Sequence, residues 1–152
     1  MDWRIVVVLA HVLAAFWYIA GYVGTNLCTE IARRSTSDEE CRSALFVSGR
    51  LDRWANRRGG TAVGLTGLLL VIVSGRTFTT PWILASTILF AGVVFAGIFV
   101  WHRFGAGVEE AVAANDWEGV RRALNAPRTI AYGRIENLAV LAIVVLMVLG
   151  PE

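Results

Sequence analysis

The stretch IVVVLAHVLAAFWYIAGYVGTNLCT, residues 5–29, carries no charged side chain and decides the fold. An α-helix needs about 17–25 apolar residues to cross a hydrocarbon core of about 30 Å. Two further charge-free stretches follow at residues 59–75 and 77–101, and a fourth apolar stretch, with two charges in its opening turns, ends the chain. The sequence therefore predicts an all-α fold, an integral membrane four-helix bundle.

Composition agrees with this prediction. Apolar residues make up 56% of the chain and charged residues 17%, the mean hydropathy is +0.59, and the charges lie between the apolar stretches. We predict a single transmembrane domain over residues 1–152, with helices at about 4–28, 60–76, 81–103 and 129–149. The net charge of +2 is too small to indicate a nucleic-acid partner. Basic residues that are all Arg, with abundant Ala, Val and Gly, indicate a bacterial genome rich in G and C.

Arginine positions predict the orientation in the membrane. Basic flanks resist translocation, so the loops that carry them stay in the cytoplasm. Residues 30–58 and 102–128 contain eleven arginines, whereas only Arg4 and Arg76 lie on the opposite side. We therefore expect a multi-pass protein of the bacterial cytoplasmic membrane, with both long loops cytoplasmic and both termini outside. Cys28 and Cys41 would then face a reducing compartment, which favours free thiols.

Both long loops carry helix-start signals. Ser37 followed by Glu40 has the form of a capping box, and the residues after it recur at helical spacing. Asp116 is a similar start, and the helix that it opens would turn Val120 and Leu124 toward the membrane and stop near Pro127. We predict short amphipathic helices in the cytoplasmic loops, the first of them lying on or entering the inner membrane surface.

His11 is the first candidate functional residue. It lies about six residues, or roughly 9 Å, inside the first helix, on a face of small residues that also carries Tyr18. A neutral imidazole at this depth is either a ligand of haem or a metal, a proton carrier, or a packing residue bonded to a hydroxyl or carbonyl of a neighbouring helix. His11 and Tyr18 are therefore candidate cofactor-binding residues, with haem as the cofactor. Two cysteines without a nearby histidine predict no metal site.

A second candidate is a polar cluster at the inner end of the helices. The last helix must take Arg134 and Glu136 into the membrane to be long enough, because few residues follow them. One interpretation is an internal network in which Glu136 pairs with an arginine, and the other is an inner-leaflet pocket that holds an anionic group. The predicted members are Arg50, Arg53, His102, Arg103, Arg134, Glu136 and Asn137.

The opening segment Leu9-Ala10-His11-Val12-Leu13-Ala14-Ala15-Phe16-Trp17, followed by Gly21, resembles the first helix of a group of small bacterial membrane proteins. The chain is most similar to the predicted integral membrane family numbered 2269 among domains of unknown function. It also resembles CopD-type copper-resistance proteins and HemJ-type protoporphyrinogen oxidases. The weaker likeness over the rest of the chain rests on Arg50-Leu51-Asp52-Arg53, Gly67, Trp82 and Gly150-Pro151.

The resemblance to the oxidases implies that His11 matches their first-helix histidine. Their lysine after the tryptophan that opens the third helix is Ser86 here, and their Asn-Glu pair reads Glu136-Asn137. We therefore do not expect oxidase activity in this chain. The scarcity of Met and His residues argues against a pathway for copper ions through the membrane. The sequence favours a small structural or accessory membrane protein without enzymatic activity. The alternative is a haem- or tetrapyrrole-binding protein that uses His11, and lipid and a second protomer or larger membrane complex are the expected partners.

Overall fold

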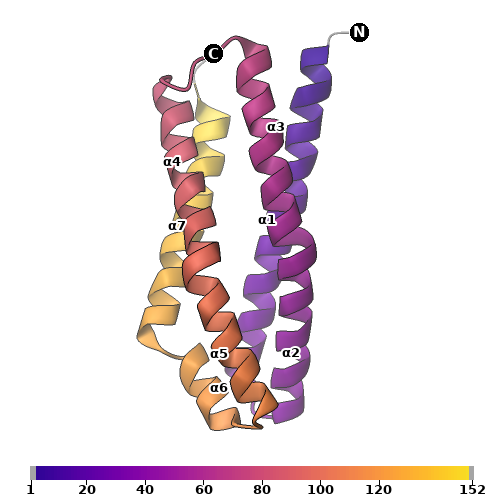
Figure 1. The fold of residues 1–152 in the computed structure, drawn as a ribbon, viewed down its shortest axis with the longest axis vertical. Coiled ribbons are helices and arrows are strands. Elements are labelled where there is room, and N and C mark those ends of the chain that lie inside the picture. The colour runs from indigo at the N-terminus through magenta and orange to yellow at the C-terminus, as the bar shows by residue number, and fades with distance from the viewer. Residues whose placement is uncertain (1–2, 151–152) are drawn as a thin grey trace. The chain divides into compact units, whose positions relative to one another are not determined.

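The computed structural model describes residues 3–150, and Pro151, named in the resemblance above, lies outside them. Every regular element between residues 3 and 150 is helical (Figure 1). The chain divides into two compact units, Met1–Thr77 and Phe78–Glu152. Each unit is described by itself below.

Unit 1 is a helical hairpin. Its first arm is α1 (Trp3–Arg34), and its second arm runs from α2 (Asp38–Leu51) through the π-helical segment η1 (Asp52–Arg57) into α3 (Arg58–Ser74). Ser37 caps α2 as the capping-box pattern predicts, because its side-chain oxygen accepts a hydrogen bond from the Glu40 backbone N–H at 3.1 Å. The second arm ends at Gly75, whose φ of 68° favours a residue without a Cβ.

The second arm differs from the expected arrangement. Residues 38–57 do not form a separate loop helix, because the backbone at the joints Asp52 and Arg58 keeps right-handed helical angles. The loop helix and the membrane helix are therefore one rod with a π-helical segment between them. A π-helical segment lets one side of a long helix stay on the same partner, and buried residues face α1 along the whole rod. These residues are Cys41, Ala44, Ser48, Ala55, Gly59 and Val63.

Unit 2 begins with a second long rod. It runs from α4 (Pro81–Ala96) through the π-helical segment η2 (Gly97–Trp101) into α5 (His102–Ala113). Pro81 stands at the first turn of α4, where a missing backbone N–H costs nothing. The rod continues about ten residues beyond the expected end at residue 103, so much of the second loop is helical.

The remainder of unit 2 consists of α6 (Trp117–Leu124) and α7 (Pro127–Leu149). Asp116 caps α6, because its carboxylate accepts from the Gly119 backbone N–H at 2.8 Å. Val120 is completely buried and Leu124 nearly so, which agrees with the inward face predicted for this helix. Helix α7 packs along α4, as Figure 1 shows.

Three helices of the described chain are long and apolar enough to cross a membrane: Trp3–Arg34, Pro81–Ala113 and Pro127–Leu149. Helix α3 has 17 residues, about 25 Å at 1.5 Å per residue, which is at the lower limit for crossing a core of about 30 Å. The structure therefore gives three candidate spans where the sequence predicts four. A single domain and a fourth crossing stay predictions.

Candidate functional site

The contact between His11 and Thr66 joins the two arms of unit 1. The Nδ1 atom of His11 lies 3.0 Å from the Thr66 hydroxyl oxygen. The Thr66 hydroxyl donates its own proton to the Ala62 carbonyl at 2.6 Å. With the Thr66 proton donated to the Ala62 carbonyl, the Thr66 oxygen accepts from His11, so we assign the imidazole proton to Nδ1, which leaves a lone pair on Nε2.

The surroundings of His11 are closely packed on the α3 side. Only 8% of the residue is exposed, and a Cβ added to Gly67 would lie 3.1 Å from the imidazole Cε1. The absence of a side chain at Gly67 is thus what makes room for the ring. No space for a macrocycle remains between His11 and α3, because helix backbone already fills that side.

Tyr18, the second predicted cofactor-binding residue, lies about two helical turns after His11 on α1. A Cβ added to Gly59 would lie 2.9 Å from the Tyr18 Cα, and one added to Gly60 would lie 3.5 Å from its ring. The rings of Tyr18 and Tyr22 lie 6.0 Å apart. Tyr18 therefore takes part in the closest approach of the two arms, where glycine lets membrane helices pack backbone to backbone.

A network of polar side chains lies between Tyr18 and the loop end of the hairpin. The Thr29 and Ser48 hydroxyl oxygens lie 3.2 Å apart. Asn56 donates to the Thr25 hydroxyl at 3.3 Å and to the Asp52 carboxylate at 3.4 Å. Asp52 also accepts from Arg57 at 2.9 Å. The sequence analysis did not name this network, although Thr25 and Thr29 share the small-residue face of α1 with His11.

Glu136 has a hydrogen-bond partner that the sequence did not indicate. The Trp101 indole Nε1–H donates to its carboxylate at 2.6 Å. Trp101 is the last residue of the π-helical segment η2, in the rod formed by α4, η2 and α5, and Glu136 lies on α7. A Cβ added to Gly133 would lie 3.9 Å from the Trp101 ring, so the tryptophan lies across this face of α7. The predicted pairing of Glu136 with an arginine stays a prediction.

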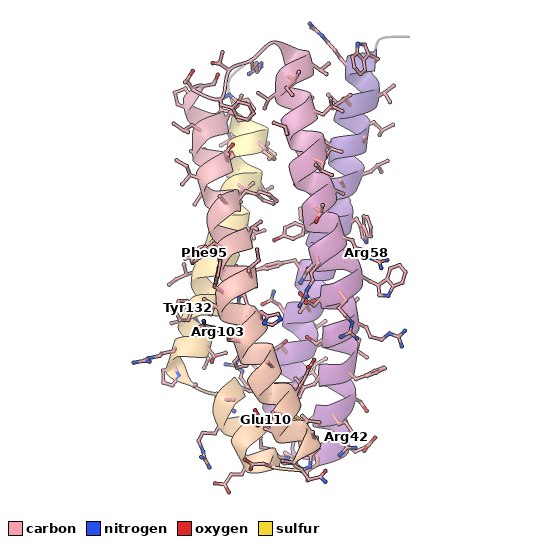
Figure 2. The ribbon with its side chains drawn as sticks, in the orientation of Figure 1. Arg42, Arg58, Phe95, Arg103, Glu110 and Tyr132 are labelled. Atoms are coloured by element: carbon pink, nitrogen blue, oxygen red, sulfur yellow. The ribbon has the colours of Figure 1, made fainter. Side chains whose placement is uncertain are left out.

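The other members of the predicted inner cluster fall in both units. Arg50 and Arg53 are exposed on unit 1, where the Arg50 guanidinium carbon lies 5.4 Å from the centre of the Phe46 ring. His102, Arg103, Arg134 and Asn137 are exposed on unit 2, and Figure 2 labels Arg103 on α5 and Arg58 on α3. The Arg58 guanidinium lies 4.0 Å over the Trp54 ring, an arrangement typical of a membrane interface.

Metal ligands do not gather in the described part of the chain: between residues 3 and 150 there is no group of three or more His, Cys, Asp or Glu side chains that could hold an ion. Cys28 and Cys41 are free thiols, and Cys41 is buried.

The long apolar helices, with polar side chains paired between them, define an all-α protein of the integral membrane class. A family model described as "Predicted integral membrane protein (DUF2269)" matches residues 5–151, nearly the whole chain. The chain therefore belongs to this family. No curated protein matches the chain, and no solved structure matches it.

Proposed function

We propose that this integral membrane protein is a structural or accessory component of the bacterial cytoplasmic membrane, and that its intramembrane polar residues hold its helices together. The observation that carries this proposal is the His11–Thr66 hydrogen bond at the close contact with Gly67. A packing histidine is expected to bond to a hydroxyl of a neighbouring helix, and hydrogen bonds of this kind commonly join membrane helices.

We further propose that α3 crosses the membrane together with α1. The contacts between the arms run in opposite directions along the chain. His11 contacts Gly67, Tyr18 contacts Gly59, and Gly21 contacts Ala55. The arms are therefore antiparallel, and eight residues of α3 beyond Thr66 extend along the outer part of α1. If α1 spans the bilayer, α3 accompanies it over most of that depth.

Charge supports the same topology. With four crossings, the arginine-rich segments 30–58 and 102–128 lie on one side, as the positive-inside tendency requires. With three crossings, the segment that contains Arg103, Arg121, Arg122 and Arg128 would be translocated. We infer that both segments are cytoplasmic and both termini are outside.

A second candidate function is haem or tetrapyrrole binding through His11. The support is the hydrogen bond at Nδ1: in the tautomer assigned above, His11 donates from Nδ1 and keeps Nε2 as a ligand atom, which is the usual arrangement in metal sites. The side of His11 that faces α3 does not accommodate a macrocycle, so a porphyrin would have to approach from another side. The packing role fits the geometry of unit 1 better.

An absorption spectrum separates the two functions. Protein purified from cells supplied with a haem precursor is expected to show no Soret band, and His11→Ala is expected to lower thermal stability in detergent without any spectral change. A Soret band in the wild type that His11→Ala removes, while Thr66→Val keeps it, would replace the packing role by the haem-binding role.

A further inference from the structure

An open groove lies at the junction of α6 and α7 in unit 2. Its volume is about 500 Å³, and it is lined by Asn125, Pro127, Ile130, Ala131, Arg134 and Ile135. Four of these residues are apolar, and the only charge in the lining is the Arg134 guanidinium. The groove is therefore an apolar surface groove with one charged side chain, Arg134, in its wall.

Within residues 3–150, no ion pair neutralises Arg134. The residue is exposed, and Glu118, an acid on the neighbouring helix α6, pairs with Arg122. The nearest carboxylate along the chain, Glu136, accepts a hydrogen bond from Trp101.

The depth of Arg134 calls for a negative partner. It lies seven residues, or about 10 Å, beyond the first residue of α7. A span of about 20 residues that ends at Leu149 would begin near Ile130, which puts Arg134 a few ångströms inside the hydrocarbon boundary. An arginine at this depth extends its guanidinium toward the phosphate level and binds anionic groups there.

We propose that this groove binds an anionic glycerophospholipid of the inner leaflet. An acyl chain lies along Ile130, Ala131 and Ile135, and the phosphate accepts hydrogen bonds from the Arg134 guanidinium. No acidic side chain lines the groove to bind an amine, so a headgroup with net negative charge is preferred over a zwitterionic one. This proposal rests on the topology proposed above, because it requires the α6–α7 corner to lie at the cytoplasmic surface.

Surrounding charge favours the same ligand. Arg121, Arg122 and Arg128 precede the groove on α6 and on the first turn of α7. The acids on these two helices are Asp116, which caps α6, Glu118, which pairs with Arg122, and Glu136. Each arginine near an anionic leaflet contributes about 1 kcal/mol, or about fivefold in affinity.

The test is retention of lipid by purified full-length protein. Wild type is reconstituted with equal amounts of phosphatidylglycerol and phosphatidylcholine, extracted in mild detergent and examined by native mass spectrometry. We expect the wild type to keep phosphatidylglycerol in preference, and Arg134→Gln to reduce that retention about fivefold. Arg76→Gln is the matched control, because it removes the same charge on the opposite side of the membrane in the proposed topology and should retain lipid as the wild type does.

Ala131→Leu fills the groove without changing any charge and should also release the lipid. Equal retention of both lipids by the wild type, unchanged retention in Arg134→Gln, or an equal loss in Arg76→Gln would each overturn the proposal. Displacement by excess inorganic phosphate would overturn it too, since it would indicate an ion site. Labelling of introduced cysteines, described below, tests the topology independently, so a failed lipid site and a failed topology are distinguishable.

Discussion

The indole nitrogen of Trp101 lies 2.6 Å from a carboxylate oxygen of Glu136, and this hydrogen bond joins the rod formed by α4, η2 and α5 to α7. Trp101 is the last residue of the π-helical segment η2. A π-helical segment changes the direction of the side chains that follow it relative to a regular α-helix. The irregular turn and the ionisable residue on α7 therefore belong to one feature of the fold.

Trp101→Phe should destabilise the protein by about 1–3 kcal/mol, because the Glu136 carboxylate loses its donor in a poorly hydrated place. The measurement is thermal unfolding in detergent. Trp17→Phe is the matched control, since Trp17 is 45% exposed on α1. Equal losses in the two variants would show that the hydrogen bond contributes nothing. Glu136→Gln keeps an acceptor for the indole, so a loss of about 1–3 kcal/mol in that variant would report the predicted arginine partner.

Thr66→Val and His11→Ala should be coupled by about 0.6 kcal/mol in a double-mutant cycle, the average for hydrogen bonds between membrane helices. Thr66→Val keeps the shape of the side chain and removes the hydroxyl that accepts from His11. Thr61→Val is the control, because the Thr61 hydroxyl bonds only to the Arg57 carbonyl of its own helix turn. Coupling of the same size with Thr61 would disprove a specific His11–Thr66 bond.

Gly59→Ala should cost about 1–3 kcal/mol, because the new Cβ would lie 2.9 Å from the Tyr18 Cα and the two arms would have to separate. Gly92→Ala on α4 should leave stability unchanged or raise it slightly, because no atom lies within 4 Å of the added Cβ and alanine favours the helix. Thermal unfolding of both variants in the same detergent tests the pair. A Gly59→Ala protein as stable as the wild type would contradict the close packing.

The number of membrane crossings can be measured with single cysteines introduced into a variant that lacks Cys28 and Cys41. The native Cys41 is buried and reacts too poorly to serve as a reporter. With four crossings, a membrane-impermeant thiol reagent added to intact cells should label Thr79→Cys and should miss Ser43→Cys and Gly107→Cys. With three crossings and the same orientation of α1, it would label Gly107→Cys and miss Thr79→Cys. Labelling of Ser43→Cys would instead show that the orientation is reversed.

Much of the secondary structure follows from local signals in the sequence. Ser37, Pro81 and Asp116 mark helix starts because their effect depends only on the first turn of a helix. The membrane class follows from the length of the charge-free stretches. These features require no knowledge of which helix contacts which.

The candidate sites were harder to predict because they depend on register between helices. The sequence indicates that His11 faces a helix of small residues, but nothing local selects Thr66 as its partner. Trp101 was read only as the end of an apolar stretch, since the π-helical segment that directs it to Glu136 leaves no composition signal. The continuity of α2 with α3 has no local signal for the same reason: Arg53, Arg57 and Arg58 favour a helix at the membrane surface, while packing against α1 makes that helix continuous with α3.

The antiparallel hairpin of unit 1 also sets the timing of its assembly during synthesis. His11 and Thr66 are 55 residues apart along the chain. At about 5–20 residues per second, a ribosome adds Thr66 roughly 3 to 11 s after His11. During this interval the imidazole has no Thr66 hydroxyl to bond to. In the nascent chain, the His11 imidazole must therefore form its hydrogen bonds with the insertion machinery, with water or with lipid headgroups until Thr66 packs against it.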